Sequence, residues 1–252
     1  MKKDSPEKLQ TVLQKVQFQP EEKELFQEII DCMYIPKDET TGIYEQHQGY
    51  FDLPHVEVSE IPMEDFPLYS HWSYDRIYRN DMIKQPDVLM FMLLFNSQFS
   101  LDELRANYEY YEPRCIHESS LSPSVHSILA CQLGKMQQAS DFFAFATRMD
   151  LDNYNRNTAE GLHTTSIAAA WMNIVFGFGG LRCDGEELLL APSIPKGWKG
   201  YSFRIVYGGD VIVVKINQDK VQLSTLHGSR ISIRLYGEEV TLSGEILETA
   251  MR

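Results

Sequence analysis

The sequence has few cysteines and no long apolar stretch. Its four cysteines, Cys32, Cys115, Cys131 and Cys183, are widely spaced and form no Cys-x-x-Cys pair. This spacing predicts neither a structural zinc site nor a disulfide framework. No apolar run reaches the ~20 residues that a membrane-spanning helix needs, and the chain starts with a charged, polar segment rather than a signal sequence. We therefore expect a protein of the reducing cytoplasm that has no contact with membranes.

Positive charge is also scarce. The 252 residues include 23 Lys and Arg against 36 Asp and Glu, which gives a formal net charge of -13. Binding of nucleic acid requires basic surface patches, so this charge argues against a nucleic acid partner. The sequence contains no glycine-rich nucleotide fingerprint, no Gly-x-Ser-x-Gly elbow and no His-x-x-x-His metal pair. We expect neither a metal ion nor an organic cofactor.

The first 180 residues mostly show the spacing of amphipathic helices. A run that is apolar on all sides predicts a buried helix over residues 87–95, and the capping box Ser100-Leu-Asp-Glu103 predicts where another helix begins. Predicted helices cover residues 5–17, 21–34, 87–95, 100–110, 123–133, 136–148 and 167–176, whereas residues 35–70 show no regular pattern. Helices that alternate with polar loops indicate an α-helical toroid with its site at one rim.

From Leu181 the spacing changes from helical to alternating. Asp184-Gly185 and Gly208-Gly209 predict turns between strands. The predicted strands cover residues 187–190, 202–207, 211–216, 221–225, 231–235 and 239–242. Residues 190–252 hold 8 basic against 6 acidic residues, while the preceding residues hold 15 against 30, so composition also changes near residue 185. We expect a helical domain over residues 1–182 and a small β-sandwich domain over residues 183–252.

The loop from Tyr110 to His126 is rich in polar groups for a connection between helices, which is commonly about 2 to 8 residues long. One interpretation is that Ser122 caps the next helix and that Pro123 is its first residue. That interpretation does not account for several polar side chains that arrive together: Arg114, His117, Glu118, Ser119 and Ser120. We interpret the segment as a binding loop.

Two further segments predict binding groups. Lys84 and Gln85 precede the buried helix, where a lysine needs a partner or a polar cavity. Four polar residues stand where the last helix begins: His163, Thr164, Thr165 and Ser166. A single Thr or Ser there is usually only a cap, but free N–H groups and the helix dipole favour an anion beside four such residues.

Aromatic rings recur within the irregular segment over residues 35–70. These rings could line a pocket, or they could hold the segment against a helical body: Tyr44, His47, Tyr50 and Phe51. The sequence favours the second alternative slightly, because aromatic side chains more often pack in a core than line a site.

Three stretches, residues 72–87, 110–126 and 150–180, resemble glycoside hydrolase family 65, the disaccharide phosphorylases typified by maltose phosphorylase. The resemblance implies the later part of an (α/α)6 barrel followed by a C-terminal β-sandwich, and it suggests a homodimer. Family members are several times longer. Their general-acid glutamate lies in a segment that has no counterpart here, so the chain resembles a C-terminal portion that could need the missing N-terminal part for activity.

The resemblance also implies a reaction, the inverting phosphorolysis of an α-linked glucose disaccharide, with maltose as the first candidate, to β-glucose 1-phosphate and glucose. Inorganic phosphate is then a co-substrate. The resemblance assigns Lys84 and Gln85 to the transferred glucose unit, and it assigns a larger set to phosphate: Ser119, Ser120, His163, Thr164 and Thr165. Glu118 could be the base of a hydrolase, although we favour a structural partner of Arg114 or His117. The alternatives are a family hydrolase of the α-glucosidase type and a non-catalytic, truncated remnant that binds sugar or anions.

Overall fold

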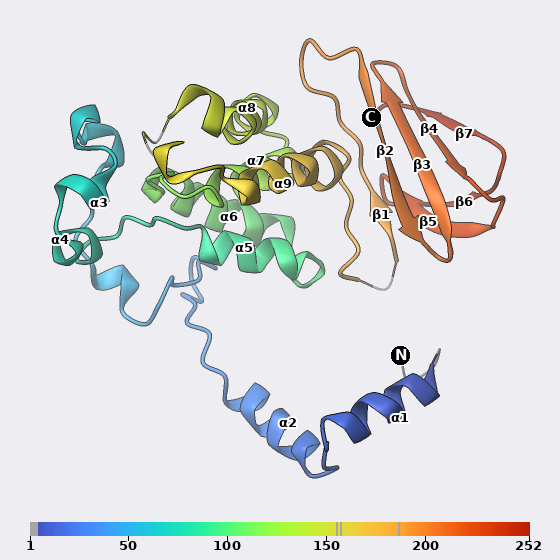
Figure 1. Cartoon of the computed structure of the whole chain (residues 1–252), viewed down its shortest axis with the longest axis horizontal. Helices are drawn as coiled ribbons and strands as arrows, with labels where there is room; N and C mark the ends of the chain where they lie inside the picture. Colours follow the sequence, from blue (N-terminus) through green and yellow to red (C-terminus); the bar gives the residue numbers. More distant parts are fainter. Residues whose placement is uncertain (1–4, 155, 157, 186) are drawn as a thin grey trace. The chain divides into compact units, whose positions relative to one another are not determined.

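The structure is a computed structural model that describes residues 5–154, 156, 158–185 and 187–252. It divides into two units, Met1–Pro36 and Lys37–Arg252. The first unit contains α1 (Pro6–Lys15) and α2 (Glu22–Cys32), as the apolar spacing predicts (Figure 1). Neither helix buries a residue, and several of their apolar side chains are exposed: Val12, Leu25, Phe26, Ile29 and Ile30.

The second unit begins with a largely irregular stretch, as predicted. Short 3-10 turns and two short helices, α3 (Leu68–His71) and α4 (Tyr74–Tyr78), precede the longer helices. Those helices are α5 (Asp87–Leu94), α6 (Leu101–Tyr111), α7 (Ser122–Gln132), α8 (Met136–Asp152) and α9 (Thr164–Met172), which continues as a π-helix over Asn173–Phe178. Most predicted helix ends are correct to within three residues, and the predicted capping box is present at Ser100. Among the described residues, no helix is both long and apolar enough to cross a membrane.

Helices α5 and α7 run in the same direction. The segments that precede them pair at Ile83 and Cys115, as in a parallel bridge. At their far ends, the side-chain amides of Asn96 and Gln132 exchange two hydrogen bonds of 3.0 and 2.9 Å. Because both beginnings and both ends meet, the two helices are parallel, and α6 is the return connection between them.

The π-helix that continues α9 also runs parallel to α7. The amide of Asn173 donates to Ser124 Oγ near the start of α7 (3.4 Å). Four residues further on, a side chain added at Gly177 would lie 3.6 Å from Ile128. Helix α8 connects the two, and Ser127 Oγ donates to its carbonyl at Ala139 (2.8 Å). The α5, α7 and α9 helices therefore all point the same way.

A buried arginine holds the C-terminal ends of these three parallel helices. The Arg182 guanidinium donates to the carbonyls of Phe176 (2.6 Å) and Leu181 (2.7 Å), and to the side-chain oxygens of Asn96 (3.2 Å) and Gln132 (2.7 Å). Its side chain lies where the negative ends of helix dipoles converge. Burial lowers the pKa of Arg182 to about 10, so the side chain stays charged at neutral pH. The N-terminal ends of the three helices lie away from Arg182.

The C-terminal region is β-rich and has two sheets. Strands β2 (Gly200–Tyr207), β3 (Asp210–Asn217), β4 (Lys220–Thr225) and β7 (Leu247–Ala250) form an antiparallel sheet. Strands β1 (Leu189–Leu190), β5 (Ile231–Leu235) and β6 (Glu238–Leu242) form the other sheet, in which β1 pairs with β5 in parallel. Both sheets contribute to one buried apolar cluster. The six predicted strands are confirmed, whereas β7 was not predicted.

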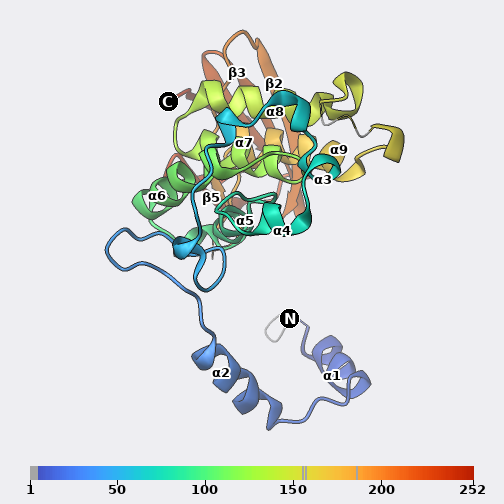
Figure 2. The ribbon, with the colours of Figure 1, turned by 90° about the vertical axis from the view of Figure 1, so that its left-hand side faces the viewer.

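The helices and strands of the second unit meet at an aromatic cluster. The Trp198 ring lies 5.5 Å from Phe178 and 5.7 Å from Phe143 on the helices, and 6.0 Å from Tyr201 on β2. Gly180 makes the chain turn from helix to strand, because its φ is +61° and a Cβ there would lie 2.4 Å from the Ala191 carbonyl oxygen. Figure 2 shows helices α7 and α8 of this unit in front of strands β2 and β3. The predicted structural role of the β-region is consistent with this contact.

One buried carboxylate, that of Asp210, holds several backbone segments of the β-region together. Asp210 is buried and accepts the backbone N–H groups of Val211, His227 and Ser229. Burial acts to raise its pKa, but these donors outweigh burial and lower it. We expect Asp210→Asn to lower the Tm at pH 7 by about 5 °C, because an amide keeps only one acceptor oxygen. The exposed Asp219→Asn is the matched control.

The same carboxylate predicts a pH dependence of this Tm difference. A carboxyl group whose pKa is lower in the folded state stabilises the protein above its unfolded pKa, and this contribution is lost as pH falls towards the folded value. The difference in Tm between the wild-type protein and Asp210→Asn should therefore be largest at pH 7 and should shrink below pH about 4. Calorimetry between pH 3 and 7 measures it, and a difference that is constant with pH contradicts the assignment.

Candidate substrate and phosphate site

Lys84 and Gln85 lie directly before α5, beside the loop over residues 110–126. The backbone N–H of Ile83 donates to the Arg114 carbonyl (2.9 Å), and the Ile116 N–H donates to the Ile83 carbonyl (3.0 Å). This pairing fixes Lys84 and Gln85 next to the polar loop. Both side chains are exposed, although they stand at the start of a helix with a buried face.

A hollow of about 340 Å³ opens beside these two residues. Its wall includes Lys84 and Gln85 together with Gln46, His47 and Tyr50 from the irregular segment. Amide, imidazole and ammonium groups around an aromatic ring suit a sugar, which presents hydroxyls at its edge and an apolar face. The sequence left open whether the rings at positions 47 and 50 line a pocket, and the structure places both there.

The other two rings of that segment have a packing role. Tyr44 makes edge contacts with Phe91 (6.0 Å) and Phe99 (5.8 Å), and Phe51 makes one with Tyr110 (5.7 Å). Tyr50 packs as well, because it is 1% exposed and its ring contacts those of Tyr110 (6.4 Å) and Tyr111 (5.7 Å). Three of the four rings therefore pack against the helical body, and Tyr50 also borders the hollow beside His47.

Ser119 and Ser120 lie immediately before α7. Ser119 is buried, and its Oγ accepts the Leu121 N–H (3.2 Å), while Ser120 is half-buried. The interpretation of Ser122 as the cap is wrong: the capping position is Leu121, Ser122 is the first helical residue, and no side chain caps α7. The start of α7 offers few free N–H groups, because Pro123 has none and the Ser122 N–H donates to the Ser119 carbonyl (3.4 Å). An anion here would be bound chiefly by the serine hydroxyls.

Glu118 is buried in the same loop and is held by a backbone donor. Its Oε1 accepts the N–H of Leu68. Burial raises the pKa of Glu118, against the lowering effects of the Leu68 N–H and of Lys84 nearby. A carboxylate that is already hydrogen-bonded to the backbone is poorly placed to activate water, so the structure does not favour Glu118 as a hydrolytic base.

Glu118 was expected to be a structural partner of Arg114 or His117, and Arg114 pairs with another carboxylate instead. Arg114 Nε donates to Asp81 Oδ2 (2.8 Å), and its NH1 donates to the Tyr110 carbonyl (2.8 Å). Asp81 is buried and also contacts His55 Nδ1 (2.7 Å). The sequence did not predict that Asp81 anchors this loop.

His163, Thr164 and Thr165 lie at the start of α9, where no side chain caps the helix. His163 is half-buried, and the two threonines are exposed. Asp150, near the end of α8, accepts from the His163 backbone N–H (2.9 Å) and contacts its Nδ1 (2.5 Å). These hydrogen bonds lower the pKa of Asp150, so it is ionised at neutral pH. Asn155 and Asn157 of the predicted polar loop lie outside the described residues.

Asp150 thus fixes the imidazole ring of His163, which the sequence predicts as a phosphate ligand. The only signal for Asp150 in the sequence was its position in a polar loop. Ser166, which the sequence grouped with His163, is buried and donates to the Ala146 carbonyl instead (2.8 Å). The neighbouring hydroxyls of Thr164 and Thr165 remain available at the helix start.

All the predicted site residues belong to the N-terminal ends of three parallel helices. Lys84 is joined to the Ser119 loop by backbone pairing, through Ile83. In the part of the chain that the structure describes, His163 is linked to that loop by helix packing rather than by a direct hydrogen bond. The fold and this polar end define a class: a helical domain that gathers polar side chains at one end, followed by a two-sheet β-region.

The chain belongs to glycosyl hydrolase family 65. The model of its central catalytic domain matches residues 2–172, and the model of its C-terminal domain matches residues 181–242. The maltose phosphorylase of Bacillus subtilis (strain 168) is 44% identical over 223 residues, which are 88% of this chain and 30% of that protein. The α,α-trehalose phosphorylase of Thermoanaerobacter brockii is 41% identical, over 98% of this chain and 32% of that protein.

A solved structure is also similar to this chain. The protein named "Putative kojibiose phosphorylase from human microbiome" superimposes with a TM-score of 0.87 at 48% identity, over 95% of this chain and 33% of that one. The chain therefore spans about a third of the length of the relatives that it matches.

The site geometry gives a prediction for phosphate. In a phosphorylase that contains this segment, we expect Asp150→Asn to raise the KM for phosphate about tenfold with a smaller change in kcat, because the amide orients His163 poorly. The exposed Asp141→Asn on α8 is a matched control. Initial rates at varied phosphate measure the effect, and an unchanged KM for phosphate would remove His163 from the phosphate site.

Proposed function

We propose that this chain supplies the glucose- and phosphate-binding part of an inverting disaccharide phosphorylase. The family membership, together with the names of the relatives, supports this reaction class. The observation that carries the proposal is the shared orientation of α5, α7 and α9, which brings Lys84, Ser119 and His163 to the same end. Within this proposal, the parallel helices with their return helices would form part of an (α/α)6 barrel, and the two sheets that share one core would form a β-sandwich.

The proposed reaction needs the protein to position phosphate. A phosphate oxygen attacks the anomeric carbon of an α-linked glucose, the bond from that carbon to the bridging oxygen breaks, and a general acid protonates the departing sugar oxygen. Attack on the opposite face yields β-glucose 1-phosphate. Phosphate is already an anion, so the site must aim it rather than deprotonate it. Ser119, Ser120 and the start of α9 would bind the phosphate oxygens, and Lys84 with Gln85 would bind the glucose.

A chimera tests the proposal. This chain replaces the matching segment of the Bacillus subtilis maltose phosphorylase, and the chimera is supplied with phosphate and one of four disaccharides: maltose, kojibiose, nigerose or trehalose. We expect glucose 1-phosphate from at least one of them, with maltose first. A folded chimera that forms none contradicts the proposal and favours a segment that only binds sugar or anions.

Phosphate dependence separates the phosphorylase from a family hydrolase. A phosphorylase releases no free glucose without phosphate, whereas a hydrolase releases two glucose molecules from maltose in phosphate-free buffer. The engagement of Glu118 by the Leu68 N–H favours the phosphorylase. The expected cytoplasmic location and the expected homodimer remain predictions.

A further inference from the structure

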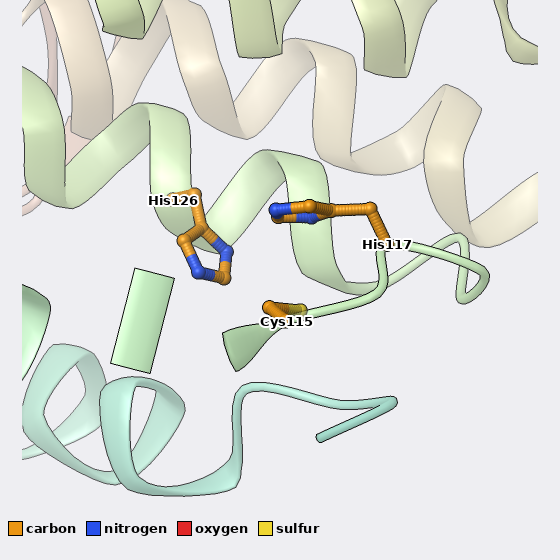
Figure 3. Close-up of side chains that lie close together, drawn as sticks. All are labelled: Cys115, His117 and His126. Atoms are coloured by element: carbon orange, nitrogen blue, oxygen red, sulfur yellow. The ribbon is translucent and has the colours of Figure 1, made fainter. Parts of the chain in front are cut away.

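A second group of side chains that could bind a ligand lies in the loop over residues 110–126 and at the start of α7. Cys115 and His117 precede α7, and His126 projects from its first turns towards them (Figure 3). One potential ligand atom from each lies within 4.8 Å of the other two. The sequence did not indicate this group, because a Cys-x-His spacing followed by a histidine nine residues later matches no standard metal pair.

His126 has an unpartnered nitrogen in the protein interior. Its relative exposure is 0%, and its Nδ1 lies 2.8 Å from the Ser122 carbonyl oxygen, an acceptor only. Nδ1 must therefore carry the proton, which leaves a lone pair on Nε2. That Nε2 is buried without a hydrogen-bond partner among the described residues. A buried acceptor that is left unpaired costs free energy, so a bound group there would stabilise the fold.

The surrounding contacts orient the two imidazoles as metal ligands commonly are. Ser122 holds both rings, because its Oγ lies 3.1 Å from His117 Nδ1 and its carbonyl bonds His126. Such outer hydrogen bonds fix the tautomer and the direction of metal-binding histidines. His117 adopts a left-handed backbone with φ +52°, which turns its ring towards His126, at a centroid distance of 4.7 Å.

We propose that Cys115, His117 and His126 bind a soft or borderline d10 cation, Zn²⁺ or Cu⁺. One sulfur and two imidazole nitrogens form a ligand set that both ions accept. Two ligands on one tetrahedral metal lie roughly 3.3 to 3.7 Å apart, so small side-chain rotations would close the group from its present spacing. As the metal–sulfur bond forms, the Cys115 thiol releases its proton to solvent.

Charge and access are compatible with this site. Burial lowers the pKa of His126 to about 4 and holds that of His117 well below its usual range. Burial raises the pKa of Cys115 to about 12, and the metal must displace that proton. His117 and Phe142 also line a hollow of about 320 Å³ at the surface, which gives an ion a route inwards.

The proposed metal would hold the loop that carries Ser119 against the start of α7. The metal-site proposal does not depend on the proposed function, because metal binding and protein stability can be measured without any substrate. Three aromatic contacts supply the competing explanation: the Phe142 ring lies 4.9 Å from His117 and 5.2 Å from His126, so the three rings could simply pack together. The test must therefore separate metal binding from ring packing.

The experiment uses the full chain stripped with a chelator and kept reduced. Zn²⁺ is titrated against a chromophoric chelator, Cu⁺ is titrated anaerobically against a copper(I) chelator, and Co²⁺ is added as a spectroscopic probe for Zn²⁺. We expect one equivalent of Zn²⁺ or Cu⁺ per chain and a Tm rise of roughly 5 to 10 °C at saturation. If Zn²⁺ is the ion, Co²⁺ shows a thiolate charge-transfer band.

Two variants and one control make the result specific. Cys115→Ser removes the thiolate, and His126→Asn keeps a donor for the Ser122 carbonyl while it removes the second nitrogen. Both variants should lose the metal binding and the Tm rise. Cys131→Ser removes a cysteine that lies on α7 outside the group, and it should keep both. Wild-type protein that binds no ion, or binding that survives Cys115→Ser, overturns the proposal and leaves ring packing as the role of the group. If His126→Asn does not fold, the loss of Zn²⁺ or Cu⁺ binding in Cys115→Ser decides alone.

Discussion

Replacing Arg182 with methionine is expected to lower the free energy of unfolding by about 3 kcal/mol, because the substitution removes a charged hydrogen-bond donor from a buried site. The guanidinium donates to four oxygens and is only 8% exposed. Methionine fills most of the volume but leaves the carbonyls of Phe176 and Leu181 without this donor. Chemical denaturation of the full chain, followed by circular dichroism, measures the change.

Two further variants show whether the hydrogen-bond geometry or the charge is responsible. Arg182→Lys keeps the charge but cannot reach the Asn96 and Gln132 oxygens and both carbonyls at once, so we expect an intermediate loss. Arg204→Met, which truncates an exposed arginine of β2, should be nearly neutral. If Arg182→Met is also neutral, the three helix ends are held by apolar packing and by the Asn96–Gln132 amide pair without a contribution from Arg182.

The order of elements could be predicted from the sequence, because apolar spacing reflects which face of each element is buried. The change of period at Leu181 separated helices from strands correctly. Strand β7 was missed because only alternate residues from Leu247 to Ala250 are half-buried and none is fully buried. The extra length of α8 was missed because the polar residues after Arg148, including Asp150 and Asp152, resembled a loop.

The candidate site could be predicted in its residue types but not in its pairings. Side-chain groups such as His163 and Ser119 stand out because helix starts rarely carry so many polar residues. Their partners come from elsewhere in the chain: Asp150 is 13 residues before His163, and Leu68 is 50 residues before Glu118. Such pairings depend on how helices pack, which local spacing does not encode.

The direction of the helices gives the separate residues a common location. Polar helix starts alone do not show that three of them face the same end. That conclusion required the Ile83–Cys115 bridge at one end and the Asn96–Gln132 amide pair at the other. Because the parallel arrangement depends on contacts far apart in the chain, the site is a property of the packed domain.

Lys84→Met is expected to lower kcat/KM for the disaccharide about 100-fold in the chimera, because the ammonium group would be lost from the hollow beside Gln85. Lys84 lies 5.0 Å from the centre of the Tyr69 ring and is exposed enough to reach a ligand. Removal of its charge should also raise the pKa of Glu118, which Lys84 lowers. Lys196→Met, at an exposed lysine before β2, is the control.

The comparison of Lys84→Met with Asp150→Asn tests the division of the site into a sugar part and a phosphate part. We expect Lys84→Met to change chiefly the kinetic constants for the disaccharide and Asp150→Asn chiefly those for phosphate, with initial rates measured while each substrate is varied. Because Lys84 is a cation near the Ser119 loop, it could instead bind phosphate directly. In that case Lys84→Met would raise the KM for phosphate and leave that for the disaccharide unchanged, and the sugar assignment of Lys84 would be wrong.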